Sequence, residues 1–167
     1  MRIPHRRRRE GKTDYRKRLA LLKSGKTRLV VRKSLEHMRV QFIDYDERGD
    51  VVVASAFSKE LGKFGWKHGC GNVPAAYLTG LLAGVRARER VKEAVLDLGL
   101  QTSTKGSRLY AALRGVLDSG ISVPHSPDIL PSEDRILGKH INPEIEKSVL
   151  EVKKAIVGGK DGVESEN

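Results

Sequence analysis

The chain has 167 residues, of which 38% are hydrophobic, so it is long enough for one compact domain with extensions and too short for two separate cores. Its 32 Lys and Arg residues outnumber 21 Asp and Glu residues, and the net charge of +11 predicts a polyanionic partner, either nucleic acid or an acidic membrane surface. The single cysteine, Cys70, excludes an intramolecular disulfide, and no apolar run approaches the roughly 20 residues that span a bilayer. We therefore expect a cytoplasmic protein without a signal peptide or a membrane segment.

The positive charge is concentrated at the front of the chain. Residues 1–33 hold 14 basic and 2 acidic side chains, whereas residues 34–167 hold 18 and 19. Residues 1–13, which include the run Arg6 to Arg9, contain almost nothing to bury. We expect this basic arm to be disordered alone and to become ordered on a phosphate backbone. A merely solvated tail is the alternative, and the concentration of charge argues against it.

The first predicted elements are a helix and three strands. Asp14 is a suitable cap for a short helix whose Leu19 and Leu22 face inward. Three β-rich segments follow, at residues 28–33, 38–45 and 51–57. Hydrophobic and polar residues alternate in the second segment, which is the period of a half-buried strand, and a glycine-containing turn precedes the third. This part of the sequence predicts an antiparallel meander.

Helical and strand patterns alternate in the next part of the chain. The expected elements are a glycine-rich loop at residues 61–72, a helix at 74–90, a short buried strand at 94–98 and a second helix that ends at Gly120. Gly80 and Gly84 lie four residues apart, and we expect them to allow close packing of the first helix on the sheet. A meander followed by helix, strand and helix predicts an α/β fold: a mixed sheet, with three antiparallel strands and one parallel strand, and packed helices.

The last part of the chain is expected to be an extension of this fold. Residues 121–142 contain three prolines, which predict irregular backbone structure, and a terminal helix is expected at residues 144–157. We therefore expect four parts: a basic disordered arm at residues 1–13, an α/β RNA-binding domain at 14–120, a C-terminal extension with a terminal helix at 121–157 and a disordered tail at 158–167.

Motifs for catalysis or metal binding are weak. Two Gly-Lys-Thr triplets, at residues 11–13 and 25–27, are similar to the end of a phosphate-binding loop, but neither has the glycine that this loop needs five residues earlier. His68 and Cys70 could be half of a metal site, yet there is no second cysteine and the other histidines have no ligand spacing. The sequence therefore predicts no catalytic residue, no metal and no cofactor.

Two other classes of protein stay open. A metal-dependent nuclease on an α/β fold of this kind needs several carboxylates around two metal ions, whereas the first strand offers Arg28, Arg32 and Lys33 where a ligand is needed. A membrane-surface protein needs a basic amphipathic helix with large apolar residues, and residues 14–23 offer few. Cleavage of RNA in Mg²⁺ and sedimentation with liposomes test these two alternatives.

Three stretches of the chain closely resemble one protein family. They are DYRKRLALLKSGKTRLVVRKS at residues 14–34, GKFGWKHGCGNVPAAYLTGLLAGVRAR at 62–88 and AVLDLGL at 94–100. In this order they are similar to the universal large-subunit ribosomal protein that binds 5S rRNA, numbered eighteen in bacteria and archaea and five in eukaryotes. The similarity extends from about residue 3 to about residue 140, and the moderate C-terminal extension looks archaeal.

The resemblance implies a domain of the type found in ribonuclease H-like translational components, without the active site of their nuclease relatives. It implies a structural constituent of the large ribosomal subunit that binds 5S rRNA and attaches it to 23S rRNA in the central protuberance. The neighbouring ribosomal protein that shares 5S rRNA is a further implied partner. We therefore expect a non-enzymatic protein of the cytoplasmic ribosome; another structural RNA-binding protein is the alternative.

Carried onto this sequence, the resemblance implies that the arm threads between RNA segments and that the first helix grips the 5S backbone. Guanidinium groups can pair with phosphate through two parallel hydrogen bonds, which suits the arginines of the arm. Phe64 and Trp66 are expected either to stack on bases or to anchor their loop to the core. The expected RNA-binding residues are Arg6, Arg7, Arg8, Arg9, Lys12, Tyr15, Arg16, Arg18, Lys26, Arg28, Arg32, Lys33, Lys63, Phe64, Trp66 and Lys67.

Overall fold

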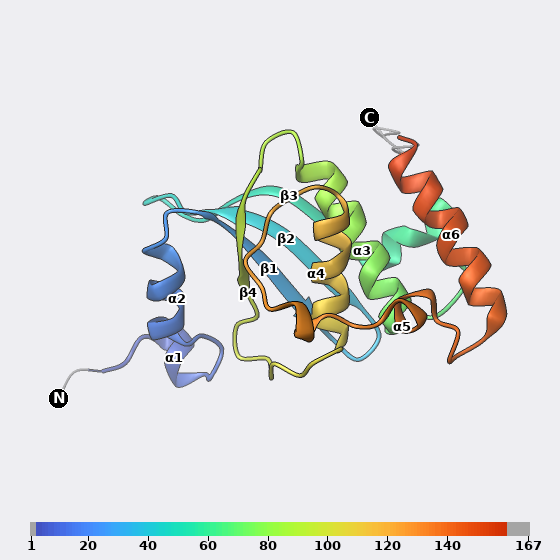
Figure 1. Ribbon diagram of the computed structural model, residues 1–167. Coiled ribbons are helices and arrows are strands. Elements are labelled where there is room, and N and C mark those ends of the chain that lie inside the picture. The colour runs from blue at the N-terminus through green and yellow to red at the C-terminus, as the bar shows by residue number, and fades with distance from the viewer. Residues whose placement is uncertain (1–2, 160–167) are drawn as a thin grey trace.

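The computed structural model describes residues 3–159. The helices and strands are, in chain order, α1 (Arg6–Arg9), α2 (Tyr15–Leu22), β1 (Thr27–Lys33), β2 (Met38–Asp44), β3 (Val51–Phe57), the 3-10 helix η1 (Ser58–Phe64), α3 (Val73–Ala87), β4 (Ala94–Asp97), α4 (Arg108–Asp118), the 3-10 helix η2 (Pro127–Ile129), α5 (Glu133–Leu137) and α6 (Pro143–Val157). In Figure 1 the sheet lies in the middle of the molecule, with α3 and α4 against one of its faces. The helices α1 and α2 lie at one end, and α6 lies at the opposite end.

The sheet is mixed, as the sequence predicts. Its strand order is β3-β2-β1-β4, in which β2 is antiparallel to both β1 and β3, while β4 is parallel to β1. Successive residues of a strand point to opposite faces, so Leu29 and Val31 are fully buried on the helix side, together with Phe42 of β2. Arg28 and Arg32 occupy the opposite face of β1. The predicted α/β class, the meander and the parallel strand are confirmed.

The helices α3 and α4 pack closely because glycines leave room at their crossing. A methyl group on Gly80 would overlap the carbonyl oxygen of Ala112, and one on Gly115 would overlap the carbonyl oxygen of Tyr77. Gly84 likewise faces the end of α4. The expectation that Gly80 and Gly84 allow close packing on the sheet is therefore wrong, because both glycines point to the neighbouring helix.

The helix α2 begins as predicted but is oriented differently. The Asp14 side chain accepts hydrogen bonds from the backbone amides of Arg16 and Lys17, at 3.0 and 3.2 Å. Leu19, expected to face inward, is 56% exposed, and none of the residues of α2 is buried. Asp14, Lys17 and Leu21 share the face that turns toward the sheet, as residues three or four positions apart do.

The C-terminal extension is part of the main core. The segment expected to be irregular contains η2 and α5, and the predicted last helix is present as α6. Ile145, Val149, Val152 and Ile156 of α6 join the same hydrophobic cluster as the sheet. The expected loop after β3 begins inside η1. Of the tail expected from residue 158, only two glycines are described, and the rest of that prediction lies outside the described residues.

Candidate nucleic-acid interface

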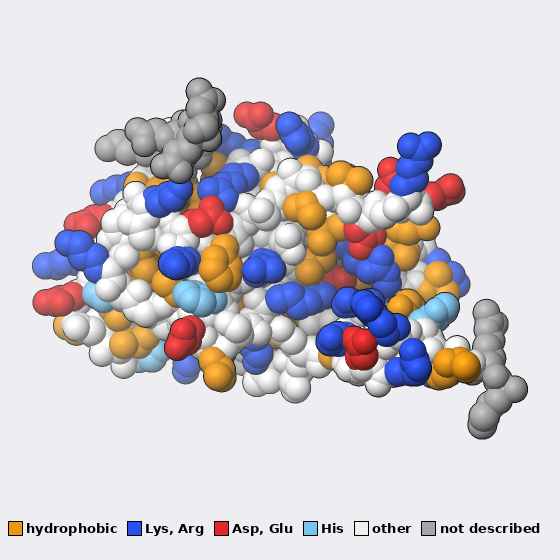
Figure 2. All heavy atoms as spheres, turned by 180° about the vertical axis from the view of Figure 1, so that it is seen from behind, with side chains coloured by type: hydrophobic (Ala, Val, Ile, Leu, Met, Phe, Trp, Pro, Cys, Tyr) orange, Lys and Arg blue, Asp and Glu red, His pale blue; other side chains and the backbone are white. Residues whose placement is uncertain are grey.

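The arm and α2 form an exposed basic surface. The side chains of α1 are all exposed, and the rings of His5 and Tyr15 lie 5.2 Å apart, which joins the arm to the start of α2. Arg6 and Lys12 lie 3.5 and 2.9 Å from the carboxylate of Glu10. Figure 2 shows Lys and Arg side chains gathered beside the N-terminal end. Among residues 3–159, the cations of this surface that have no ion-pair partner are Arg7, Arg8, Arg9, Arg16 and Lys17.

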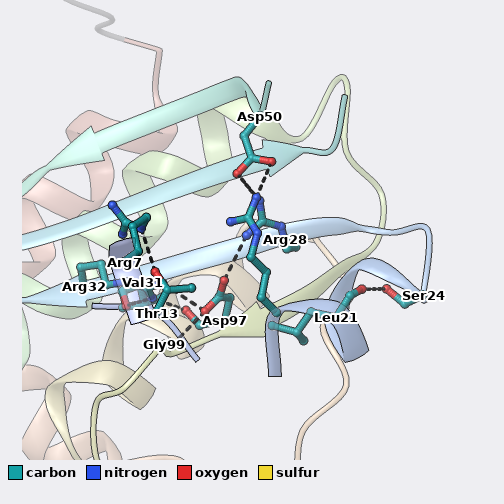
Figure 3. Close-up of polar contacts among 11 residues, drawn as sticks. Arg7, Thr13, Leu21, Ser24, Arg28, Val31, Arg32, Asp50, Asp97 and Gly99 are labelled. Atoms are coloured by element: carbon teal, nitrogen blue, oxygen red, sulfur yellow. Dashed lines mark hydrogen bonds and ion pairs between the residues drawn. The ribbon is translucent and has the colours of Figure 1, made fainter. Parts of the chain in front are cut away.

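A network of charged side chains joins α2, the sheet and the β2–β3 hairpin. Arg28 donates hydrogen bonds to Asp50 at 2.7 Å and to Asp97 at 3.2 Å. Arg18 binds Asp50 at 2.8 Å, and Arg32 binds Asp97 at 3.0 Å. In the register of β1 and β4, Asp97 lies opposite Val30, which is midway between Arg28 and Arg32. The Asp97 carboxylate is therefore within reach of both arginines. Figure 3 shows Arg28 between the two carboxylates.

The burial of Arg28 argues against its expected contact with RNA. Its side chain is only 3% exposed, and both terminal nitrogens of its guanidinium group bind carboxylates. A buried charge is stable only when it is paired in this way. The structure therefore gives Arg28 a role in holding the hairpin and β4 together, in place of the expected place on an RNA-facing surface.

The same network sets the charge of Asp50. Partial burial alone would raise the pKa of Asp50, but hydrogen bonds from Arg18 and Arg28 and their positive charges outweigh burial and hold the pKa below the ordinary 3.8. Asp50 is thus a carboxylate at neutral pH, held by two arginines. In the same hairpin, the Asp46 carboxylate accepts a hydrogen bond from the Arg48 amide at 3.0 Å, as an aspartate in a turn commonly does.

A cavity of about 570 Å³ lies between the arm, α2 and the face of the sheet that carries Arg28. Its floor and walls are largely apolar and come from α2, β1, β2 and β4 together with the segment that follows β4. Its three acidic side chains are Asp14, Asp50 and Asp97, and its six basic side chains are Arg7, Lys12, Lys17, Arg18, Arg28 and Arg32. The cavity wall therefore has an excess of positive charge.

Two of the three remaining cations expected on β1 and its flanking turn, Lys26 and Arg32, bind carboxylates of this chain. Lys26 lies 2.6 Å from Glu93, although both side chains are largely exposed. Arg32 donates to the Asp97 carbonyl oxygen at 2.6 Å as well as to its carboxylate. Lys33, at the end of the strand, is exposed and has no ion-pair partner in the part of the chain that the structure describes.

A second group of expected contacts lies away from the arm. Lys63 and Lys67 are exposed on the segment that joins β3 to α3. This segment contacts α6, where His68 Nε2 lies 3.1 Å from Ser148 Oγ. Since α6 is at the opposite end of the molecule from α1 and α2 (Figure 1), the structure does not bring the two groups onto one surface.

The two aromatic residues of this segment pack against the hydrophobic core. Trp66 is 5% exposed, and its indole N–H donates to the Gly69 carbonyl oxygen at 3.4 Å. Phe64 is half-buried and packs against the same core. Of the two alternatives, anchoring of the loop therefore describes both side chains, and the stacking of Trp66 on a base does not fit its burial.

Lys17 belongs to the surface although it is absent from the residues expected to bind RNA. It is exposed, it follows the capping Asp14 on the same helix face, and it lines the cavity. The helical spacing of three to four residues could have identified this face, because Lys17 lies between Asp14 and Leu21.

The described residues contain no group of three or more His, Cys, Asp or Glu side chains that could hold a metal ion. The Cys70 thiol donates to the Ser58 carbonyl oxygen at 3.4 Å, and His68 contacts α6, so both serve local structure. No helix in residues 3–159 has the length and apolar character needed to cross a bilayer.

An α/β domain with a basic arm and an exposed cationic helix is typical of proteins that bind nucleic acid. Comparison with known proteins agrees with this class. A model of the family described as ribosomal large subunit proteins 60S L5, and 50S L18 matches residues 1–94 and 85–126. Large ribosomal subunit protein uL18 of Korarchaeum cryptofilum is 64% identical over 146 residues, which cover 87% of this chain and 75% of that protein. The protein of the same name from Methanococcus maripaludis is 59% identical over 141 residues, covering 84% and 73%.

The chain therefore belongs to the family of large-subunit ribosomal proteins 60S L5 and 50S L18. It is a structural constituent of the large ribosomal subunit, located in the cytoplasm within the ribosome, and it is not an enzyme. The family resemblance and the archaeal type predicted from the sequence are confirmed by these archaeal relatives.

Proposed function

We propose that the chain binds 5S rRNA and attaches it to 23S rRNA in the central protuberance, beside the neighbouring ribosomal protein that shares 5S rRNA. The observation that carries this proposal is the exposed basic surface of the arm and α2. Arg7, Arg8, Arg9 and Arg16 of this surface have no ion-pair partner among residues 3–159, so they can make hydrogen bonds to phosphate without first breaking such a pair. Membership of a ribosomal protein family favours rRNA as the partner, and the basic surface provides side chains that can bind its phosphates.

Two groups of residues are proposed to contact RNA. The first, at the end that carries the arm, comprises Arg6, Arg7, Arg8, Arg9, Lys12, Tyr15, Arg16, Lys17, Arg18, Lys26, Arg32 and Lys33. The second, Lys63 and Lys67, lies beside α6. A protein with cations at both ends can touch two RNA segments at once, which supports a role in joining 5S rRNA to 23S rRNA.

We also infer a relationship to the ribonuclease H-like translational components. The antiparallel meander, followed by a helix and a strand parallel to β1, supports this relationship. Asp50 and Asp97, which line the cavity on the face of the sheet that carries Arg28, are both bound by arginines, so they are poorly placed to collect metal ions.

The test is a filter-binding titration with homologous 5S rRNA and a tRNA competitor at about 0.2 M salt, which suppresses much of the non-specific binding. Tight binding that tRNA does not displace supports the 5S assignment. Equal displacement by tRNA would leave only a general structural RNA-binding protein.

Two double variants, one on the arm and one on α6, test which end of the molecule binds 5S rRNA. The double substitution Arg8→Gln and Arg9→Gln should weaken 5S binding and flatten the salt dependence by roughly one unit of slope for each phosphate that is no longer bound. The matched control is Lys147→Gln with Lys154→Gln, because both lysines are exposed on α6 at the other end of the molecule. The control should leave affinity for 5S rRNA unchanged.

A further inference from the structure

We propose that the cavity between the arm, α2 and the sheet is a binding site for one unstacked nucleotide of RNA. The base enters the cavity, and its phosphate lies against the exposed cations Arg7 and Lys17. This inference rests on the proposed function and deepens it, since it names the part of the RNA that this site takes.

The size and the apolar walls of the cavity fit a base. Its volume of about 570 Å³ lies in the range of about 300–1,000 Å³ that is typical of small-molecule sites. Leu21 of α2 lies on one side, and Val30 and Ile43 of the sheet lie on the other. A flat base has apolar faces and a polar edge, and proteins recognise RNA mainly through unpaired bases that leave the stack.

The charges at the cavity fit a phosphate. Arg7 donates through Nε to Thr13 Oγ1 at 2.8 Å, which leaves its two terminal nitrogens without a partner among residues 3–159 (Figure 3). Lys17 is exposed and has no ion pair in the same part of the chain. Asp50 and Asp97 are each bound by two arginines, so the repulsion of a phosphate by their charges is largely compensated.

A polar group that could meet the edge of a base is also present. Gln101 lines the cavity, and its side-chain amide makes only long contacts of 3.4 Å with the Lys33 backbone. An amide offers one acceptor and two donors, so it can pair with a donor and an acceptor on the edge of a base.

The first experiment is an NMR titration of the full chain with each of the four nucleoside 5′-monophosphates, and separately with inorganic phosphate. We expect nucleotides to shift the backbone amides of Thr13, Gly99 and Gln101, which line the cavity. Inorganic phosphate should shift the Thr13 region near Arg7 only. This titration uses the unchanged chain, so it does not depend on the folding of a variant.

The second experiment fills the cavity without removing a charge. Ala20 lines the cavity, whereas the neighbouring Leu19 does not and is 56% exposed. Ala20→Trp should abolish the nucleotide shifts and weaken 5S rRNA binding by about tenfold or more, as expected for loss of one buried base. Leu19→Trp places the same ring on the other side of α2 and should leave the nucleotide shifts unchanged.

Several outcomes would overturn the inference. Equal shifts at Gly99 and Gln101 with phosphate and with nucleotides would mean that the cavity takes phosphate alone. Unchanged 5S binding by Ala20→Trp, with the chain still folded, would mean that no base enters, although the proposed function would stand. Failure of the unchanged chain to prefer 5S rRNA over tRNA would contradict the proposed function instead, and the mononucleotide titration would still decide about the cavity.

Discussion

Arg28 and Arg32 lie four positions apart on the same face of β1, yet their surroundings differ. The Arg28 side chain is 3% exposed between two carboxylates, while that of Arg32 is 39% exposed at the edge of the cavity. The carboxylates that bind Arg28 come from residues 22 and 69 positions further along the chain. The same residue type therefore stabilises the fold at one position and remains near the surface at the other.

Replacement of Arg28 by methionine tests its structural role. Arg28→Met leaves Asp97 buried with one arginine fewer and removes one of the two that hold Asp50, so we expect a loss of about 3 kcal/mol in the free energy of unfolding. Urea unfolding measures this value. Lys33→Met, on the exposed end of the same strand, should change it by less than about 0.5 kcal/mol. A stable Arg28→Met variant with a flattened salt dependence of RNA binding would show that Arg28 contacts RNA directly.

The lowered pKa of Asp50 predicts acid sensitivity. A carboxyl group with a lower pKa in the folded state stabilises the fold at pH values above its ordinary pKa of 3.8, and this contribution disappears as the pH falls through the lower native value. The urea midpoint should therefore fall on acidification below the ordinary pKa, and Asp50→Asn should reduce that fall. Glu47→Gln, exposed in the same hairpin, is the control and should keep the full response.

At the scale of elements, the crossing of α3 and α4 depends on glycines. Gly80→Ala should destabilise the protein by about 3 kcal/mol, because its methyl group would overlap the Ala112 carbonyl oxygen, even though alanine is about 1 kcal/mol better than glycine within a helix. Gly62→Ala is the matched control, since no atom lies within 4 Å of its added methyl group. Thermal unfolding of both variants measures the difference. Equal stability of the two variants would mean that the helices can move apart freely.

The arm is the element that sequence patterns describe least completely. Its four arginines form one helical turn, α1, which has no buried residue. The expected disorder of the arm in solution stays a prediction. The basic composition of the arm is visible in the sequence, but its placement beside α2 and the sheet is a tertiary feature.

Deletion of residues 1–13 tests the arm as a unit. The shortened chain keeps Asp14, the cap of α2, and loses no buried side chain from residues 3–13, so its unfolding midpoint should stay close to that of the full chain. Its affinity for 5S rRNA should fall, and the salt dependence should flatten by roughly one unit for each phosphate that the arm would have bound, up to about five. An unchanged salt dependence would mean that the arm does not touch 5S rRNA and would favour a contact with 23S rRNA.

At the scale of the whole molecule, the C-terminal extension and the sheet share one core. Ile145 and Val149 of α6 belong to the same cluster as Leu29 of β1. The single tryptophan, Trp66, is buried in the segment that lies beside α6. A structure of this kind should unfold as one unit.

Urea unfolding followed by two signals tests this cooperativity. The fluorescence of Trp66 reports the end that carries α6, whereas far-ultraviolet circular dichroism reports all helices and strands. We expect the two transitions to coincide, since one core connects them. A separate early change in fluorescence would show that the extension opens independently of the sheet.

Local patterns in the sequence determined the kinds of element, the mixed sheet, the basic arm and the family. These properties depend on residues close together in the chain: the alternation in β2, the Asp14 cap and the apolar spacing of α6 each lie within a few turns or a single strand. They did not determine the orientation of α2, because its thin apolar face allowed more than one choice. Leu19 was expected inward for this reason and is exposed.

The tertiary structure alone decided which cations are free to bind. Arg28 is neutralised by Asp97, 69 positions away, and Trp66 is buried beside a helix that begins more than 70 residues later. The cavity beside the arm is likewise built from four separated segments of the chain. Charge and aromatic character can be read from a sequence, but exposure depends on which distant residues the fold brings together.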